Sequence, residues 1–229
     1  MTEIIFGIIA IIITVGVYAA MVPIHKKINT PFTQPIIAVS VIIIILLLVF
    51  NIPYETYQLG GAWIDFLMGP AVVALALPLY NHFERLKKLA VPILSGVTAG
   101  SFIGVSTGLL FTKLFGFERE LILSIVPKSV TTPVAVSIAE SLEGSMSLAA
   151  VFVVIAGVSG VLMSPLIFKL FKLSSPIGRG IGLGSASHAM GTANSMGRSE
   201  LEGSISTIAM VISAVIVSVI APILVIIML

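Results

Sequence analysis

Long apolar stretches dominate the chain, and short polar segments separate them. Six of these stretches are continuous, at residues 4–22, 35–50, 62–80, 89–115, 146–171 and 205–229. A helix of about 20 residues crosses a hydrocarbon layer about 30 Å thick, so each stretch is close to the length of a transmembrane helix. Because the apolar residues do not alternate with polar ones as in barrel strands, the pattern predicts an all-α integral membrane protein with about six transmembrane helices.

Two further apolar stretches are interrupted by residues that do not suit a helix facing lipid. The first, at 121–139, contains Pro127-Lys128-Ser129-Val130-Thr131-Thr132-Pro133, and the second, at 177–196, contains Gly180-Ile181-Gly182-Leu183-Gly184-Ser185-Ala186-Ser187-His188. Such residues leave backbone groups unpaired, which the membrane interior tolerates only where protein or water surrounds them. We therefore expect re-entrant or discontinuous helices here, and these are the candidate working parts.

Composition supports the membrane assignment and excludes several kinds of function. Of the 229 residues, 58% are apolar and 10% are charged, whereas a soluble domain has about 25% charged residues. The chain contains no cysteine, which excludes disulfides, thiolate metal sites and thiol redox chemistry. The net charge of +2 comes without a basic run interleaved with aromatics, so no nucleic-acid partner is expected. We also expect no metal and no cofactor.

The two interrupted stretches belong to similar halves. Residues 141–147, SLEGSMS, resemble residues 200–206, ELEGSIS, and each is followed by a span with a proline near its end, Pro165 or Pro222. Internal repeats built around broken helices are typical of secondary transporters. We therefore predict two parts: a scaffold of four transmembrane helices at 1–116, and an inverted-repeat core at 117–229.

Basic residues indicate how the repeat core is oriented. Eight of the twelve Lys and Arg residues lie in three loops, at 26–27, 85–88 and 169–179, and such loops face the cytoplasm. All three can do so only if 121–139 enters the membrane from outside and returns. We favour two re-entrant hairpins, with tips at 128–132 and at 185–188, entering from opposite sides. Two broken helices that cross the membrane are the alternative, with the same residues at their centres.

Lys128 is the first candidate for binding. An ionisable residue inside an apolar segment is costly and marks a functional site by default, although a lysine can also extend to the membrane surface. Thr131 and Thr132 suit an N-cap and Pro133 suits the first helical turn, so a half-helix is expected to begin here. A cation beside a helix N-terminus forms an anion site, to which we assign Lys128, Ser129, Thr131 and Thr132.

The second candidate site surrounds His188. Glycines there allow the backbone to approach a ligand, and hydroxyl and amide groups are concentrated in an otherwise apolar chain. The histidine itself could bind a carboxylate or carry a coupled proton. Alternatively, His188 has a structural role and forms a hydrogen bond that holds two helices together. The residues assigned to this site are Ser185, Ser187, His188, Gly191, Thr192 and Asn194.

Two other patterns have structural interpretations. Gly96, Gly100, Gly104 and Gly108 recur every four residues, which is typical of close helix packing in membranes. Gly157-Val158-Ser159-Gly160 looks like an intramembrane serine protease motif with His188 as its base. Because the Ser159 segment reads as uninterrupted helix and no third group orients the histidine, we expect no enzyme.

Both interrupted motifs resemble the LrgB/CidB family of bacterial membrane proteins. The resemblance covers nearly the whole chain and rests on the segment 127–133 with 140–144, and on Arg179-Gly180-Ile181, Ser185, Ser187-His188 and Gly191-Thr192-Ala193. The second motif is also similar to a domain of the plant chloroplast glycolate/glycerate translocator, in which arginine takes the place of Lys128. The resemblance implies a multi-pass protein of the bacterial cell membrane.

Two functions follow from this resemblance. One is alternating-access transport of small 2-oxo or 2-hydroxy monocarboxylates such as pyruvate, lactate or glycolate, which we favour because a carrier needs a mid-membrane cation. The other is a holin/antiholin-like role that modulates murein hydrolase activity and autolysis, together with a small LrgA/CidA-type membrane protein. The expected partners are therefore a carboxylate anion, the lipid bilayer, that small protein and further copies of this chain.

Overall fold

A computed structural model describes residues 2–28, 33, 35–67, 70, 73–74 and 76–229. Regular structure in these residues is α-helical, without a β-strand among them, which confirms the predicted all-α class. The chain forms two compact units, Met1–Ala74 and Leu75–Leu229, and each is described by itself. The predicted boundary at residue 116 divides roles within the protein and stays a prediction.

Among the described residues of the first unit are the helices α1 (Thr2–Ile28), α2 (Pro35–Val49) and α3 (Tyr54–Phe66). α1 and α3 approach most closely at Gly7 and Gly60, where a Cβ atom on Gly60 would lie against the Gly7 carbonyl and 2.8 Å from Ala10 Cβ. The absence of side chains at both positions therefore permits this contact. An apolar cavity of about 120 Å³ lies among the three helices.

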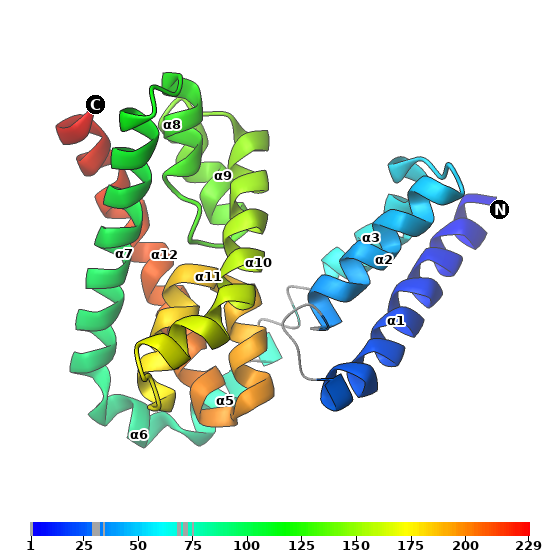
Figure 1. The fold of residues 1–229 in the computed structure, drawn as a ribbon, viewed down its shortest axis with the longest axis horizontal. Coiled ribbons are helices and arrows are strands. Elements are labelled where there is room, and N and C mark those ends of the chain that lie inside the picture. Colours follow the sequence, from blue (N-terminus) through cyan, green and yellow to red (C-terminus); the bar gives the residue numbers. More distant parts are fainter. Residues whose placement is uncertain (1, 29–32, 34, 68–69, 71–72, 75) are drawn as a thin grey trace. The chain divides into compact units, whose positions relative to one another are not determined.

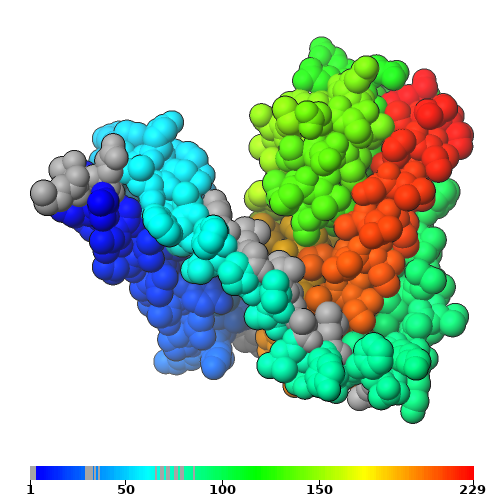
Figure 2. Space-filling view, turned by 180° about the vertical axis from the view of Figure 1, so that it is seen from behind, coloured from blue at the N-terminus to red at the C-terminus, as the bar shows by residue number. Residues whose placement is uncertain are grey.

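Two of the three long helices of the second unit, Ala90–Leu114 and Glu200–Met228, lie side by side, and the third, Met146–Leu170, packs against the two interrupted stretches (Figure 1). Its elements are α5 (Ala76–Asn81), α6 (Phe83–Lys88), α7 (Ala90–Leu114), α8 (Arg119–Ile125), α9 (Thr132–Ser141), α10 (Met146–Leu170), α11 (Pro176–Arg198) and α12 (Glu200–Met228). Seen from behind, α12 runs along the surface between α7 and the segment around α9 (Figure 2). Buried aliphatic residues, among them Val105, Val153 and Val217, fill the space between the long helices.

Four of the described helices are long and apolar enough to cross a membrane: α1, α7, α10 and α12. α2 has 15 residues, about 22 Å of helix, which is shorter than a hydrocarbon core of about 30 Å. The predicted span at 62–80 does not form one helix, because α3 starts earlier and ends at Phe66, and α5 begins at Ala76. The hydropathy pattern missed this end, because the mean hydropathy of a segment does not show where a helix stops.

Both interrupted stretches are broken where the sequence predicts. The first separates into α8 and α9, with an irregular segment from 126 to 131. The second, α11, has non-helical backbone at Ser187 and His188. These interruptions arise locally, because Pro133 can only begin a helix and glycine and serine weaken one.

Each interrupted stretch folds back on itself. The Ser145 N–H donates to Ser124 Oγ over 2.8 Å, which brings the start of α10 beside α8. In α11, Arg179 and Arg198 both bind the carboxylate of Glu202, at 3.0 Å each. In a straight helix these arginines would lie about 28 Å apart. α11 is therefore a helical hairpin with its tip at 187–188.

The two hairpins enter the second unit from opposite ends. The open end of the α11 hairpin lies beside the start of α12 and near α6, while α8 follows the far end of α7 (Figure 1). The α11 end carries Lys87, Lys88, Lys169, Lys172, Arg179 and Arg198 beside the acidic Glu84, Glu200 and Glu202, and the opposite end carries Glu118, Glu120, Glu140 and Glu143 beside the basic Lys113 and Arg119. The charge difference between the ends has the pattern that orients membrane proteins.

Candidate functional site

The first candidate site is the turn between α8 and α9. α9 begins at Thr132, with Thr131 in the N-cap position and Pro133 in the first turn, which confirms the predicted start of a half-helix. Thr131 has extended backbone, but its side chain makes no capping hydrogen bond. The first N–H groups of α9 lack partners within the helix, as at every helix start. Thr132 is exposed, and Ser129 is buried.

Lys128 lies against the middle of α7. Its Nζ donates to the Gly104 carbonyl over 2.8 Å, and a Cβ atom on Gly108 would lie only 2.6 Å from Nζ. The glycine at 108 therefore leaves room for the ammonium group. Gly104 is well inside a 25-residue helix, so the half-buried ammonium group lies far from either end of that helix. An ammonium group has three donor protons, of which this bond uses one.

The second candidate site is the tip of α11, which contacts α7 on one side and α10 on the other. Ser185 donates to Ile181 of its own helix, and its Oγ lies where a Cβ atom on Gly100 would be 3.3 Å away. Ser187 is completely buried, and its Oγ occupies the space that a side chain at Gly160 would need. The tip therefore packs closely against α7 and α10, because positions 100 and 160 are glycine.

His188 joins the tip to α10. Its Nε2 lies 3.0 Å from the Val153 carbonyl, and a Cβ atom on Gly157 would be 2.8 Å from this nitrogen. This contact supports the structural interpretation of His188, a bond that holds two segments together. Ser159, the serine of the protease-like motif, donates to Ala156 of its own helix. No hydrogen bond joins Ser159 to His188 within the described part of the chain.

The second arm of α11 contacts both the first arm and α12. A side chain at Gly191 would overlap the Leu183 carbonyl, so the two arms touch just behind the tip. Thr192 Oγ1 lies 3.1 Å from Ser206 Oγ on α12, and Asn194 is half-buried. Thr192 therefore has a protein partner in this structure.

The glycine stripe of α7 brings the two tips near each other. Gly96 and Gly100 face Ile181 and Ser185 of α11, while Gly104 and Gly108 face Lys128. Gly100 and Gly104 are separated by about 6 Å along the helix axis. Among the residues described, no hydrogen bond joins Lys128 directly to Ser187 or His188. The structure thus places Lys128 and the tip of α11 against the same helix, α7, about one helical turn apart.

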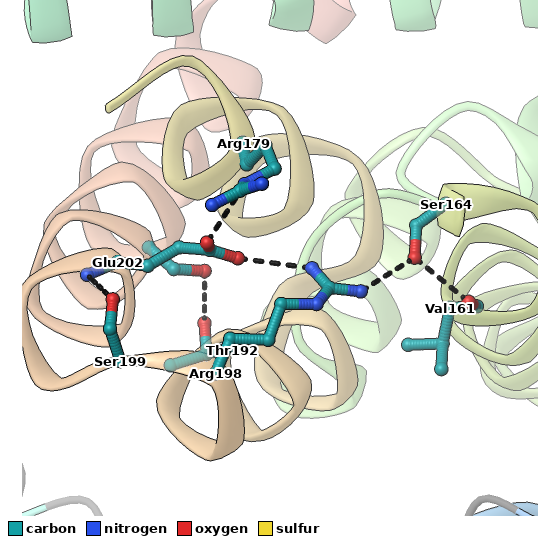
Figure 3. Close-up of polar contacts among 8 residues, drawn as sticks. Val161, Ser164, Arg179, Thr192, Arg198, Ser199 and Glu202 are labelled. Carbon is teal, nitrogen blue, oxygen red and sulfur yellow. Dashed lines mark hydrogen bonds and ion pairs between the residues drawn. The ribbon is translucent and has the colours of Figure 1, made fainter. Parts of the chain in front are cut away.

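A charged cluster at the open end of α11 was not predicted. Glu202 is completely buried and binds Arg179 and Arg198 through its two carboxylate oxygens (Figure 3). Arg198 also donates to Ser164 of α10 over 3.1 Å, and both guanidinium groups lie near the ring of Phe168. The spacing of four residues between Arg198 and Glu202 could have indicated their ion pair from the sequence. The ion pair of Arg179 with Glu202 could not be predicted, because it forms only when α11 folds back on itself.

The backbone conformation of His188 predicts that glycine at this position gives a more stable protein than alanine, which is the reverse of an ordinary helical position. Its φ of 41° and ψ of −130° are favoured only by glycine, and such backbone costs other residues about 1–3 kcal/mol. His188→Ala and His188→Gly lose the same imidazole bond, so their difference reports the backbone. We expect His188→Gly to be the more stable by about 1–3 kcal/mol, measured by unfolding in detergent.

An ordinary helical position supplies the control for this comparison. Ala186 lies in the first arm and is exposed, so Ala186→Gly should lower stability by about 0.5–1 kcal/mol. If His188→Gly is also less stable than His188→Ala, the tip does not hold the strained backbone described above.

Among the described residues, no group of three or more His, Cys, Asp or Glu side chains lies close enough together to hold a metal ion. The two tips carry hydroxyl, amide, ammonium, imidazole and backbone groups.

Comparison with known proteins places the chain in a family. The LrgB-like family model matches residues 14–227. YxaC of Bacillus subtilis, an uncharacterized protein, is 46% identical over 96% of this chain and 95% of its own length. The holin-like protein CidB is 32% identical in Staphylococcus epidermidis and 31% in Staphylococcus aureus, over 98% of each chain. No solved structure matches. With four helices able to cross a membrane, the chain is a multi-pass bacterial membrane protein, and it belongs to the LrgB-like family.

Proposed function

We propose that this chain acts as a holin-like membrane protein and that its underlying activity is the movement of small carboxylates. The names of the CidB relatives support the holin-like part, and this is the better supported part, because those names refer to a holin and not to a carboxylate. The transport part is supported by the geometry of the second unit. It would be the step through which the protein influences murein hydrolase activity.

One observation carries the transport proposal: two hairpin tips enter from opposite ends and reach the same glycine stripe on α7, with Lys128 against its middle. Broken helices that meet near the midplane are the usual substrate sites of secondary transporters. A pore needs neither a mid-membrane cation nor half-helices that begin inside the membrane. The charge and the tips are therefore best explained by binding of a small anion.

In this proposal Lys128 and the start of α9, with Ser129, Thr131 and Thr132, hold the carboxylate. Ser185, Ser187, His188 and Gly191 form the opposite wall, and Thr192 and Asn194 bind a 2-oxo or 2-hydroxy oxygen. In the present structure His188 and Thr192 are bonded to Val153 and Ser206. They must exchange these protein partners for substrate, which suits a site that changes between two states.

The membrane arrangement belongs to the same proposal. We place the α11 end of the second unit in the cytoplasm, because of its basic residues. We keep the predicted six crossings and two re-entrant hairpins, although only α1, α7, α10 and α12 among the described helices are long enough to cross as single helices. Residues 1–116 would serve as scaffold and 117–229 as the moving core. Further copies of this chain, and a small LrgA/CidA-type membrane protein, would complete the assembly.

Cysteine labelling tests this arrangement in a chain that has no cysteine of its own. Glu143→Cys is expected to react only from outside, and Glu200→Cys only from the cytoplasm, because each lies at an opposite end of the second unit. Lys88→Cys provides the cytoplasmic reference. Labelling of position 143 from the cytoplasm alone would mean that the segment 121–139 crosses the membrane.

A flux assay tests the transport proposal itself. The purified chain in liposomes should take up labelled pyruvate, lactate or glycolate with saturation, and external substrate should accelerate release of internal label. A pore would pass these solutes, and larger neutral ones, without saturation. Unsaturable leakage would therefore favour a holin-like pore without a carrier, and the absence of any flux would reject the transport part for the isolated chain.

A further inference from the structure

The glycines of α7 that face the two hairpin tips do not have the same surroundings. A Cβ atom on Gly100 would lie 3.3 Å from Ser185 Oγ, and one on Gly108 would lie 2.6 Å from Lys128 Nζ. On Gly104, between them, a Cβ atom would have open space around it, with no described atom of another segment within 4 Å. Close packing therefore explains glycine at positions 100 and 108, but not at position 104.

The open space at Gly104 lies between the two tips. Residues four apart in a helix differ in direction by about 40°, so the direction of a Cβ atom at 104 is midway between those at 100 and 108. These two neighbours face Ser185 of α11 and Lys128 of the turn between α8 and α9. Gly104 is half-buried, so part of this space is reached from the surface of the second unit. We call it the Gly104 gap.

Polar groups border the Gly104 gap along α7. Lys128 Nζ spends one donor proton on the Gly104 carbonyl, and an ammonium group has three. The Ser185 hydroxyl donates to the Ile181 carbonyl, so its oxygen can still accept a proton from another group. A hydrocarbon chain in the gap would leave the remaining ammonium donors unpaired, which is costly away from water. A small anion with a short carbon skeleton would pair with them.

We propose that Gly104 determines the size of the transported carboxylate, because its missing side chain leaves the room that the carbon atoms of the substrate occupy. The inference rests on the proposed function and adds the residue that selects short chains. Gly104 would act by space alone. Its carbonyl, which positions Lys128, belongs to the backbone and is kept when another residue takes its place.

Uptake of lactate relative to glycolate by Gly104→Ala in liposomes tests this role. Lactate is glycolate with one further methyl group, and Gly104→Ala puts a methyl group into the gap. One methyl or methylene group in a fitted site changes selectivity by about 10- to 200-fold. We therefore expect the ratio of saturable lactate uptake to saturable glycolate uptake to fall by about 10-fold or more, mainly through loss of lactate uptake.

Gly178→Ala is the matched control. Gly178 is an exposed helical glycine at the open end of α11, and a Cβ atom there would also meet no described atom of another segment within 4 Å. It is about 10 Å from Ser185 along the first arm, so this variant should keep the parent ratio of lactate to glycolate uptake. A ratio that falls equally in both variants would overturn the proposal.

Thermal unfolding in detergent checks the open space without any substrate. Alanine is the better helix former, so both variants should keep or raise Tm, by up to about 4 °C. A lower Tm for Gly104→Ala, with Gly178→Ala unchanged or higher, would mean that a methyl group at 104 displaces part of the folded protein. Selectivity could then not be assigned to the gap, and the proposal would be rejected.

The flux results separate this inference from the transport proposal. Saturable uptake by both variants with the parent ratio of lactate to glycolate would reject the role of Gly104 and leave the carrier in place. If the parent chain itself shows no saturable uptake, the carrier is rejected, and the role of Gly104 with it.

Discussion

Replacing Lys128 by alanine is expected to reduce saturable carboxylate uptake by about 10- to 100-fold. A hydrogen bond between charged groups contributes about 1.5–3 kcal/mol, and each 1.4 kcal/mol corresponds to a factor of ten in affinity. Here the loss concerns a lysine that lies against the middle of α7, where its Nζ has donors left after bonding to Gly104. The measurement is initial uptake of labelled substrate into liposomes over a range of concentrations.

Two further variants show whether the charge or the packing is responsible. Lys128→Arg keeps the cation and should retain a substantial part of the uptake. Gly108→Ala leaves the charge but places a methyl group where Nζ now lies, so it should raise the concentration needed for half-maximal uptake. Both outcomes follow from a binding site whose cation must lie in one position.

Lys113→Ala is the control for general effects of lysine removal. Lys113 is on α7, the helix that Lys128 contacts, and its Nζ donates to the Met228 carbonyl, away from both hairpin tips. Its removal should leave uptake unchanged within about twofold, because a surface contact of this kind contributes about 0–1 kcal/mol. If Lys128→Ala takes up substrate as well as Lys113→Ala does, the anion site is not at Lys128.

Local rules were sufficient for the parts of the site that depend on neighbouring residues. Pro133 determines where α9 begins, because a proline suits only the first turn of a helix. Thr131 takes the N-cap position with extended backbone but without a capping hydrogen bond. The glycine- and serine-rich run before His188 likewise predicts where α11 breaks. These features needed no knowledge of the rest of the fold.

Features that depend on distant contacts were not accessible in this way. Arg179 was counted as a loop residue that sets orientation, yet it binds a buried carboxylate 23 residues later, because α11 folds back. The partner of His188 is a backbone carbonyl of α10, which no side-chain pattern reveals. The span expected at 62–80 failed for another reason, since mean hydropathy does not detect where a helix ends.

The largest expected effect on stability concerns Glu202. Glu202→Gln leaves two arginines facing a neutral group, and removing one partner of a buried ion pair costs about 3–5 kcal/mol. The loss should be large here because this carboxylate is completely buried and joins both arms of α11 to α12. Chemical unfolding of the detergent-solubilised chain, followed by circular dichroism, measures the free energy of unfolding.

Glu200→Gln is the matched control, because Glu200 lies two residues earlier on the same helix but its side chain is 54% exposed. Its contacts with Asn81 and His82 should contribute no more than about 1 kcal/mol. Replacing Arg179, Glu202 and Arg198 together by Met, Leu and Met should recover much of the stability that Glu202→Gln loses, because a buried ion network can be exchanged for apolar residues of similar volume. Equal effects of Glu202→Gln and Glu200→Gln would show that the open end of the hairpin is held by its packing on α12 and not by this carboxylate.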